Sequence, residues 1–391
     1  MQLRGWRRAL AACVALAFLA LPLGEDAQAV ALLAVALVGG PAILRAVRVH
    51  EPRHRSPWHL FAAAIGLFLL AAIVREVEIA LAGGTERYPS VADLLDALGY
   101  GAAILSVQRL GRLRSNRRDP TNLVDALIVV GGVGVVVWVL LLVPYLTDDS
   151  FPLAARVVDL GFSLLSLTLG VGTARIAIGP GARNSSYYLL AAAVFSAFAA
   201  DLCVLLDKAT HAPVAGQGVM PLLFASLGFA GIAAAALEPS MVDLTTETTV
   251  PVGRMTSRRL ALMTAAVLVP PTVLLVDAPG GRLSGAVVIV SWLVLSGLMM
   301  VRVAGLVRAR ESAGHVEAVL RRAAASLVSA TDTGEMHTAA MAAMRELVGA
   351  SVPVVSTSVV VRTGDDWSLA AEADGGGGWL DPEELHRVLP S

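Results

Sequence analysis

The chain has 391 residues, of which 56% are hydrophobic and 16% charged, and its formal net charge is −1. A soluble domain carries about a quarter charged residues, so this composition, with a mean hydropathy of +0.71, indicates a polytopic membrane protein. The two cysteines, Cys13 and Cys203, each lie in an apolar block, which excludes a disulfide framework or a CxxC metal site.

Apolar blocks of about 17 to 26 residues recur along the chain. A helix of this length crosses a hydrocarbon core ~30 Å thick. We therefore predict an all-α polytopic membrane bundle of about ten transmembrane helices. The predicted spans are residues 7–23, 28–48, 58–82, 91–110, 122–146, 153–178, 186–208, 217–238, 259–277 and 284–307.

The joining stretches alternate in arginine content. One set holds Arg4, Arg7, Arg8, Arg45, Arg48, Arg53, Arg55, Arg109, Arg112, Arg114, Arg117, Arg118, Arg175, Arg183, Arg254, Arg258, Arg259, Arg302, Arg308 and Arg310. The other set holds only Arg87, Lys208 and Arg282. Because basic residues concentrate in cytoplasmic loops, the pattern predicts that both termini are cytoplasmic.

The first apolar block can be interpreted in two ways. Residues 4–29 have a basic start, a short apolar core and an Ala-Gln-Ala ending at Ala29, as a cleavable signal peptide has. We favour an uncleaved first span, because a multi-span protein needs no cleavage. The predicted orientation of the later spans is the same in both cases.

Ionisable residues interrupt four of the predicted spans at a similar depth near the outer side, given a rise of ~1.5 Å per residue. These candidate sensing residues, the charge layer, are Arg75, Glu76, Glu78, Asp93, Asp96, Arg156, Asp159 and Asp201. Three i,i+3 pairs occur among them, and the members of such a pair share a helix face. An ionised side chain that faces lipid costs about 3 kcal/mol or more, so we expect these faces to point into the bundle or a wet cavity.

Two arginines oppose six carboxylates in this set. The surplus predicts a hydrated vestibule, protonated carboxylates or a bound cationic group. Three interpretations stay open: a structural network at the outer boundary, a pocket that senses a small ligand or ion, and a transport path. A transport path should cross the midplane, but the inner halves offer only Asp125 and Glu238, near the cytoplasmic ends.

No catalytic constellation stands out. The seven histidines do not group with cysteines or carboxylates at metal-ligand spacings. "GGVG" at 131–134 lies within a span, where small residues allow close helix packing. Glycines 375–378 lack the strand-loop-helix context of a phosphate cradle. The sequence therefore predicts no cofactor, no metal and no nucleic-acid partner.

After about residue 308 the composition becomes more polar. Apolar and small residues recur there at heptad a and d positions. The seam consists of Leu306, Ala313, Leu320 and Leu327 together with Ala309, Val316, Ala323 and Ala330. It predicts a signalling helix over 303–332, which either packs on its own protein or forms a two-stranded coiled coil in a homodimer.

Residues 333–391 predict an incomplete α/β segment. Met336, Ala340, Met344 and Leu347 lie on one side of a helix at 333–350. "VPVVSTSVVVR" and "WSLAAEA" flank the tight turn "TGDD" and predict an antiparallel strand pair, and "DPEELHRVL" predicts a short capped helix. One helix and two strands bury too little for a core, so we expect a larger domain. The predicted division is therefore 1–308, 303–332 and 333–391.

Three stretches within residues 58–240 carry a family resemblance. "YPSVADLLDALGY", "NLVDALIVVGGVGVVVWVLLLVPYL" and "FPLAARVVDLGFSLL" resemble the N-terminal membrane sensory region of actinobacterial GGDEF/EAL (cyclic di-GMP) signalling proteins. The matched positions are Pro89, Ser90, Asp93, Tyr100, Asp125, Trp138, Pro144, Pro152, Asp159 and Asp201. Arg156 departs from the pattern, since the family more often has a small or acidic residue there.

The tail "LRRAAASLVSATDTGEMHTAAMAAMRELVGASVPVVSTSVVV" is similar to the opening of a GAF domain. The resemblance implies the sensory input half of a homodimeric signal transducer in a bacterial inner membrane, with an unknown small ligand or ion. No GGDEF or EAL motif occurs in the chain, so no cyclase or phosphodiesterase activity is assigned to it. The alternatives are a small-molecule or ion transporter with a regulatory tail, the sensor half of a histidine kinase, and an inactive truncated product.

Overall fold

The computed structural model divides the chain into two compact units, Met1–Arg302 and Val303–Ser391. We call them the membrane unit and the C-terminal unit. The structure describes residues 3–83, 87–114, 121–178, 183–212, 218–245, 257–276, 282–330, 332–349, 357–363 and 366–373.

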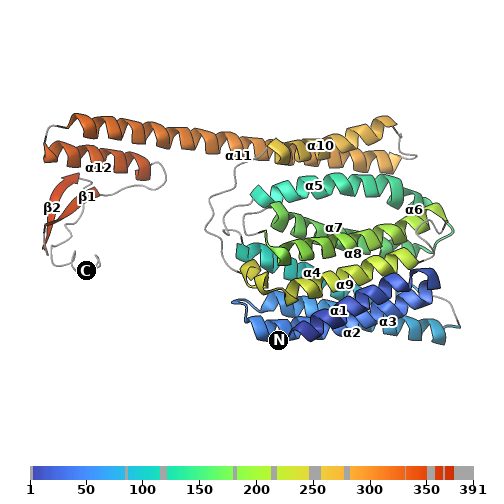
Figure 1. The fold of residues 1–391 in the computed structure, drawn as a ribbon. Coiled ribbons are helices and arrows are strands. Elements are labelled where there is room, and N and C mark those ends of the chain that lie inside the picture. Colours follow the sequence, from blue (N-terminus) through green and yellow to red (C-terminus); the bar gives the residue numbers. More distant parts are fainter. Residues whose placement is uncertain are drawn as a thin grey trace. The chain divides into compact units, whose positions relative to one another are not determined.

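The described part of the membrane unit is built from helices that run side by side (Figure 1). The long helices are α1 (Arg4–Leu19), α2 (Glu25–His50), α3 (Ser56–Leu81), α4 (Val91–Arg114), α5 (Thr121–Val137), α7 (Leu153–Ile178), α8 (Ser185–Thr210), α9 (Val219–Leu237), α10 (Ser257–Val276) and the first part of α11 (Arg282–Ser329). The short ones are η1 (Leu21–Leu23), the π-helical η2 (Trp138–Leu142), α6 (Val143–Thr147), η3 (Pro239–Met241) and η4 (Asp243–Thr245).

Within the described residues, 8 helical stretches are long and apolar enough to cross a membrane. They are Glu25–His50, Ser56–Leu81, Val91–Arg114, Asn122–Thr147, Leu153–Ile178, Ser185–Thr210, Val219–Leu237 and Gly285–Arg308. The predicted all-α, multi-pass membrane bundle is thereby confirmed. The other two predicted spans correspond to shorter apolar helices: α1 has 16 residues, and the apolar part of α10 is Arg259–Leu275.

The main apolar core of the membrane unit lies between α2, α3, α4, α8 and α9. Trp58 and Phe61 near the start of α3 are fully buried in it. Small residues let the helices approach closely. A Cβ atom added at Gly231 of α9 would lie 2.7 Å from the Cβ of Ala193 in α8, so only glycine fits at this crossing.

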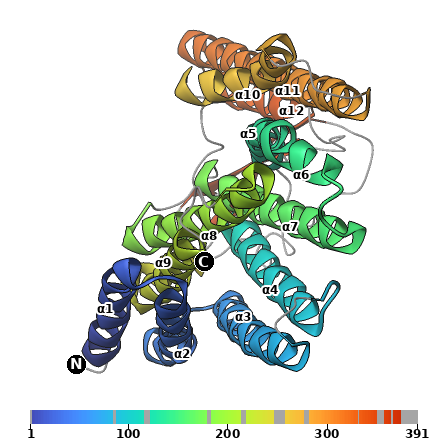
Figure 2. The same ribbon diagram turned by 90° about the vertical axis from the view of Figure 1, so that its right-hand side faces the viewer.

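Helix α5 connects this core to α10 and α11. Both views show α10 on the α5 side of the bundle (Figures 1 and 2). An added Cβ atom at Gly132 would lie 2.9 Å from the carbonyl oxygen of Ala266 in α10, and one at Gly131 would lie 2.8 Å from the side chain of Leu295 in α11. The "GGVG" motif is therefore a packing motif, as its place in an apolar span predicted.

In the C-terminal unit, the rest of α11 is followed by α12 (Thr333–Gly349), β1 (Thr357–Thr363) and β2 (Asp366–Ala373). The two strands pair antiparallel, with an irregularity between Val359 and Val360. Helix α12 contacts both strands, and Arg322 of α11 forms an ion pair with Glu346 of α12 at 2.7 Å. The helix and the strand pair thus occur in the predicted order. The predicted helix "DPEELHRVL" and the side chains of Ala309, Ala313 and Leu347 lie outside the described residues.

Candidate functional site

Polar contacts join α3, α4, α6, α7 and α8 at the end of the bundle where α3, α6 and α8 end and α4 and α7 begin. We call this region the polar layer. It contains most of the predicted charge layer together with side chains that the prediction did not include. Its contacts form three groups, named below after Arg75, Asp201 and Asp159.

In the Arg75 group, one arginine of α3 neutralises two carboxylates of α4. Arg75 Nη1 lies 3.7 Å from Asp93 Oδ1, and Arg75 Nη2 donates to Asp96. Asp93 is buried. The i,i+3 spacing of the two aspartates places both on the same side of α4, which explains how a single guanidinium reaches them.

Glu78 stabilises the beginning of α4. Its Oε1 accepts a hydrogen bond from the Val91 N–H at 3.0 Å. Ser90 and Asp93 cap the helix reciprocally: the Ser90 N–H donates to Asp93 Oδ2 at 2.9 Å, and the Asp93 N–H donates to Ser90 Oγ at 3.0 Å. The first N–H groups of a helix lack intrahelical acceptors, and its N-terminus favours negative charge. Glu78 therefore has a partner other than Arg75, although the two residues share a face of α3.

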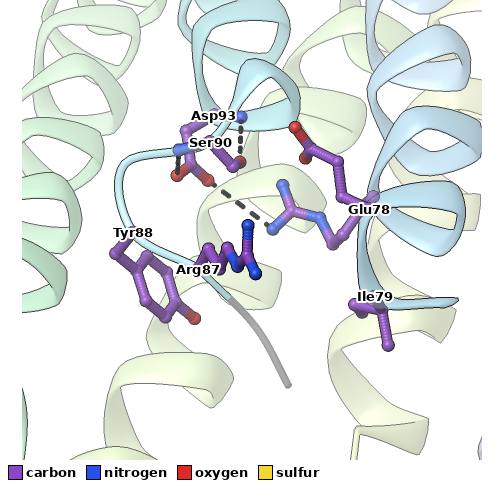
Figure 3. Close-up of a pocket in the computed structure, with 7 residues that line it drawn as sticks. Glu78, Ile79, Arg87, Tyr88, Ser90 and Asp93 are labelled. Atoms are coloured by element: carbon purple, nitrogen blue, oxygen red, sulfur yellow. Dashed lines mark hydrogen bonds and ion pairs between the residues drawn. The ribbon is translucent and has the colours of Figure 1, made fainter. Parts of the chain in front are cut away.

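A small pocket opens between the end of α3 and the beginning of α4 (Figure 3). It has room for about one water molecule. In Figure 3, Arg87 points into the space between Tyr88 on one side and Glu78 and Ile79 on the other. The residues that line the pocket are Arg75, Glu78, Ile79, Arg87, Tyr88, Ser90 and Asp93.

The Asp201 group lies deeper in the bundle and contains hydroxyl groups in place of a cation. The hydroxyl of Tyr100 in α4 donates to the Asp201 carboxylate of α8, at 2.7 Å from Oδ1 and 2.6 Å from Oδ2. Ser166 of α7 lies close to this carboxylate. The Phe68 ring packs edge-on against Tyr100 at a centroid distance of 5.3 Å. The group therefore links three helices within an apolar surround.

The Asp159 group contains Lys208, which was counted from the sequence among the basic residues of the joining stretches. Lys208 Nζ of α8 donates to Asp159 Oδ2 of α7 at 2.7 Å, and the hydroxyl of Tyr145 in α6 donates to the same carboxylate. The ammonium group of Lys208 also lies 5.7 Å from the centre of the Tyr145 ring. The sequence contained a signal that Lys208 belongs to the polar layer. Asp201 and Lys208 are seven residues apart and so share a face of α8.

Arg156 does not pair with Asp159, although the two are three residues apart on α7. Its Nη1 donates to the carbonyl oxygen of Leu146 at 2.8 Å, and its Nη2 lies 3.5 Å from Asp149 Oδ1. Both partners belong to the end of α6 or the turn that follows it. Arg156 therefore holds the α6–α7 turn.

The same turn contains an Asp–His contact outside the spans. Asp148 Oδ2 lies 2.6 Å from His211 Nε2, and the Phe151 ring stacks on the His211 ring at 5.6 Å. The Ser150 N–H donates to Asp148 Oδ1 at 2.9 Å. This N–H and the nearby His211 hold the pKa of Asp148 below its ordinary value.

The charge balance of the layer differs from the count made on the sequence. Glu76 is exposed on α3, and no polar contact is recorded for it among the described residues. Glu78 caps a helix, Lys208 is a third cation, and Asp201 accepts hydrogen bonds from hydroxyl groups. The surplus of carboxylates is therefore accommodated by several local arrangements, and no bound cationic group is needed to explain it.

The remaining residues of the family motif are structural or lie elsewhere. Pro89 and Pro152 precede α4 and α7, Pro144 lies in the first turn of α6, and Trp138 begins η2. Asp125 lies near the opposite end of the same span, where it is fully buried between Arg259 and Arg302. These two arginines were predicted only as markers of orientation, so their ion pairs with Asp125 were missed.

No protein-family model, no curated protein and no solved structure matches this chain. Across the ranges that the structure describes, no group of three His, Cys, Asp or Glu side chains is placed to hold a metal ion. The geometry of the polar layer can hold five helices in one arrangement through hydrogen bonds and ion pairs. A change in any one group would alter how those helices pack.

Proposed function

We propose that the chain is the membrane-embedded input module of a signal-transduction protein. A stimulus at the polar layer shifts the packing of the spans, and α11 relays the shift to the GAF-like C-terminal unit and to an output domain. The observation that carries the proposal is the length of α11, which runs unbroken for 48 residues, from the last span through residues 303–329. The family resemblance of residues 58–240 favours a cyclic di-GMP output and a bacterial inner membrane with cytoplasmic termini.

The exposure of the heptad seam supports relay through a homodimer. Val316, Leu320 and Leu327 are 40%, 53% and 39% exposed on the single chain, whereas Val319 is 1% exposed. Val319 and Arg322 share the face of α11 whose arginine pairs with Glu346 of α12. Leu320 and Leu327 of the a/d seam lie beside this face and stay exposed, and a second copy of the same helix would cover them.

The buried hydroxyl groups argue against a transport path. Ser106, Ser186 and Ser196 lie between spans, and each donates to a backbone carbonyl oxygen of a neighbouring helix, at 2.6, 2.7 and 2.8 Å. Hydroxyl groups used in this way have no hydrogen-bond donor left for a passing solute. A sensing role for the polar layer therefore fits the described residues better than transport does.

Cysteine cross-linking in membranes tests the dimeric relay. In a Cys13→Ala, Cys203→Ala background, we expect Leu320→Cys and Leu327→Cys each to give disulfide-linked dimers under mild oxidation. Ala325→Cys is the matched control, because Ala325 is exposed on the same helix but lies off the seam. If the two seam variants give no more dimer than Ala325→Cys does, the dimeric relay is wrong.

A further inference from the structure

A buried ion-pair cluster joins α5, α10 and α11 at the end of the bundle opposite the polar layer. Asp125 of α5 has no exposed surface; Arg302 Nε of α11 lies 2.8 Å from its Oδ1, and Arg259 of α10 contacts its Oδ2. Arg259 also donates to Asn122 Oδ1 at 2.8 Å. One carboxylate thus holds an arginine from each of two helices. We call this cluster the Asp125 joint.

The joint and the polar layer lie on the same span. Residues Asn122–Thr147 form one continuous helical stretch that includes α5, η2 and α6. Tyr145 at its far end donates to Asp159, which Lys208 also contacts. Twenty residues separate Asp125 from Tyr145, a distance of ~30 Å along a helix. A displacement of the α6 end in the polar layer can therefore reach the joint through a single element.

Between the Asp125 joint and the polar layer, apolar contacts also join α10 and α11 to α5. Ile128 of α5 forms one apolar cluster with Met263 and Ala266 of α10, and Leu298 of α11 packs against this cluster. A Cβ atom added at Gly132 would lie 2.9 Å from the Ala266 carbonyl oxygen, so glycine at this position leaves room for the α10 backbone. Within the membrane unit, α10 and the first part of α11 are therefore held to the rest of the bundle along the same helix that ends in the polar layer.

Arg302 is the residue through which the Asp125 joint can act on the rest of α11. Arg302 is the last residue of the membrane unit, and α11 continues from it to Ser329. An ion pair at this residue fixes α11 near the end of its apolar stretch, Gly285–Arg308. A buried arginine that loses its carboxylate is strongly destabilised, so a shift of α5 has to be followed by α11.

We infer that Asp125 is a positioning residue that couples the span 122–147 to α11. A change in the Asp159 group then moves the part of α11 that follows Arg302. The inference rests on the proposed function, which it deepens by assigning the point where the stimulus passes to the relay helix. A purely structural ion pair would stabilise the bundle without making α11 respond to the polar layer.

Distance measurements by double electron–electron resonance test the coupling. Spin labels are placed at Leu37→Cys of α2 and Met300→Cys of α11 in the Cys13→Ala, Cys203→Ala background; both positions are exposed on the membrane unit. The labelled protein is diluted with unlabelled protein in membranes, so that distances within one protomer are measured. Lys208→Met imitates a stimulus, because it removes the cation from Asp159. We expect it to shift the distance distribution by about 1–2 Å, the usual size of helix displacements in switching proteins.

The effect of Lys208→Met on this distance is then measured in a protein whose Asp125 joint has been removed by mutation. Asp125→Asn alone removes the carboxylate that Arg259 and Arg302 share, so the main variant is Asp125→Asn/Arg302→Gln, which keeps the net charge of the cluster unchanged. We expect Lys208→Met to cause no shift in this background and the full shift in the control Asp26→Asn, an exposed site in the first turn of α2.

The outcomes separate the two hypotheses. An equal shift with and without the joint would overturn the role of Asp125 but leave the relay proposal intact. No shift on Lys208→Met in the otherwise unchanged protein would overturn both. If the double variant does not fold, Arg302→Gln alone, which keeps the buried carboxylate paired with Arg259, serves as the joint variant with the same expected loss of the shift.

Discussion

Asp159 and Asp201 lie on neighbouring helices of the polar layer, yet different groups stabilise their carboxylates. Lys208 supplies a positive charge to Asp159, whereas the Tyr100 hydroxyl donates to Asp201. Removing one partner of a buried ion pair typically costs about 3–5 kcal/mol, and removing one neutral hydrogen bond costs about 1–3 kcal/mol. Of these two groups, the Asp159 group is therefore the one in which a change of charge has the larger effect on helix packing.

Sequence reasoning found the acidic residues of the site more readily than their basic partners. A carboxylate in an apolar run is conspicuous, and Asp93, Asp96 and Asp159 were predicted from that contrast. Lys208 and Arg302 lie near the ends of their spans, where basic residues are expected for orientation alone. Which of them faces a carboxylate depends on helix rotation and on which helices are neighbours, and a linear sequence fixes neither.

The pH dependence of the α6–α7 turn follows from Asp148. Its pKa is held below the ordinary value by the Ser150 N–H and by His211, and an unfolded aspartate titrates near about pH 4. A lowered folded-state pKa contributes stability that is complete above the unfolded pKa and is lost as the pH falls through the folded one. We expect the melting temperature of the solubilised protein to exceed that of Asp148→Asn at neutral pH, by a margin that shrinks below about pH 4. A margin that stays constant down to pH 2 would contradict this account.

At the level of elements, long apolar runs were enough to predict the bundle. The spans predicted at 58–82, 122–146 and 153–178 agree within a few residues with Ser56–Leu81, Asn122–Thr147 and Leu153–Ile178. The π-helical turn η2 was not predicted, because an extra residue in a turn leaves an apolar pattern unchanged. Helix α1 is shorter than predicted, since Ala20 ends it before the Pro22 turn.

The contact between α5 and α10 gives a prediction for a matched pair of glycines. An added Cβ atom at Gly132 would lie 2.9 Å from the Ala266 carbonyl oxygen, whereas one at Gly134 would lie 3.5 Å from the flexible side chain of Leu167. Replacing glycine by alanine in a helix favours the helix by about 1 kcal/mol in both cases, and that effect cancels in the comparison. Overpacking at the first site costs about 1–3 kcal/mol. Gly132→Ala should therefore melt at a lower temperature than Gly134→Ala, and equal melting temperatures would show that α10 does not pack on Gly132.

At the scale of the whole membrane unit, the Asp125 joint determines which parts of α10 and α11 lie at the same end of the bundle. Arg259 lies near the start of α10 and Arg302 lies about twenty residues into α11, and both contact Asp125. The end of α10 at Val276 and the beginning of α11 at Arg282 then lie toward the other end of α5, the end of the polar layer. This arrangement makes α10 run along the length of α5 although its apolar stretch, Arg259–Leu275, is short.

The alternation of arginines together with the polar layer predicts which loops face outward. Asp149, in the α6–α7 turn, is 98% exposed and belongs to the side with few basic residues. Arg53, between α2 and α3, is exposed and belongs to the arginine-rich side. In the Cys13→Ala, Cys203→Ala background, a membrane-impermeant maleimide added to intact cells should label Asp149→Cys, and it should label Arg53→Cys only after the cells are permeabilised. The reverse pattern would place the polar layer on the cytoplasmic side, and a stimulus would then have to reach it from within the cell. Labelling of both residues in intact cells would mean that the seven apolar stretches from α2 to α9 do not all cross the membrane.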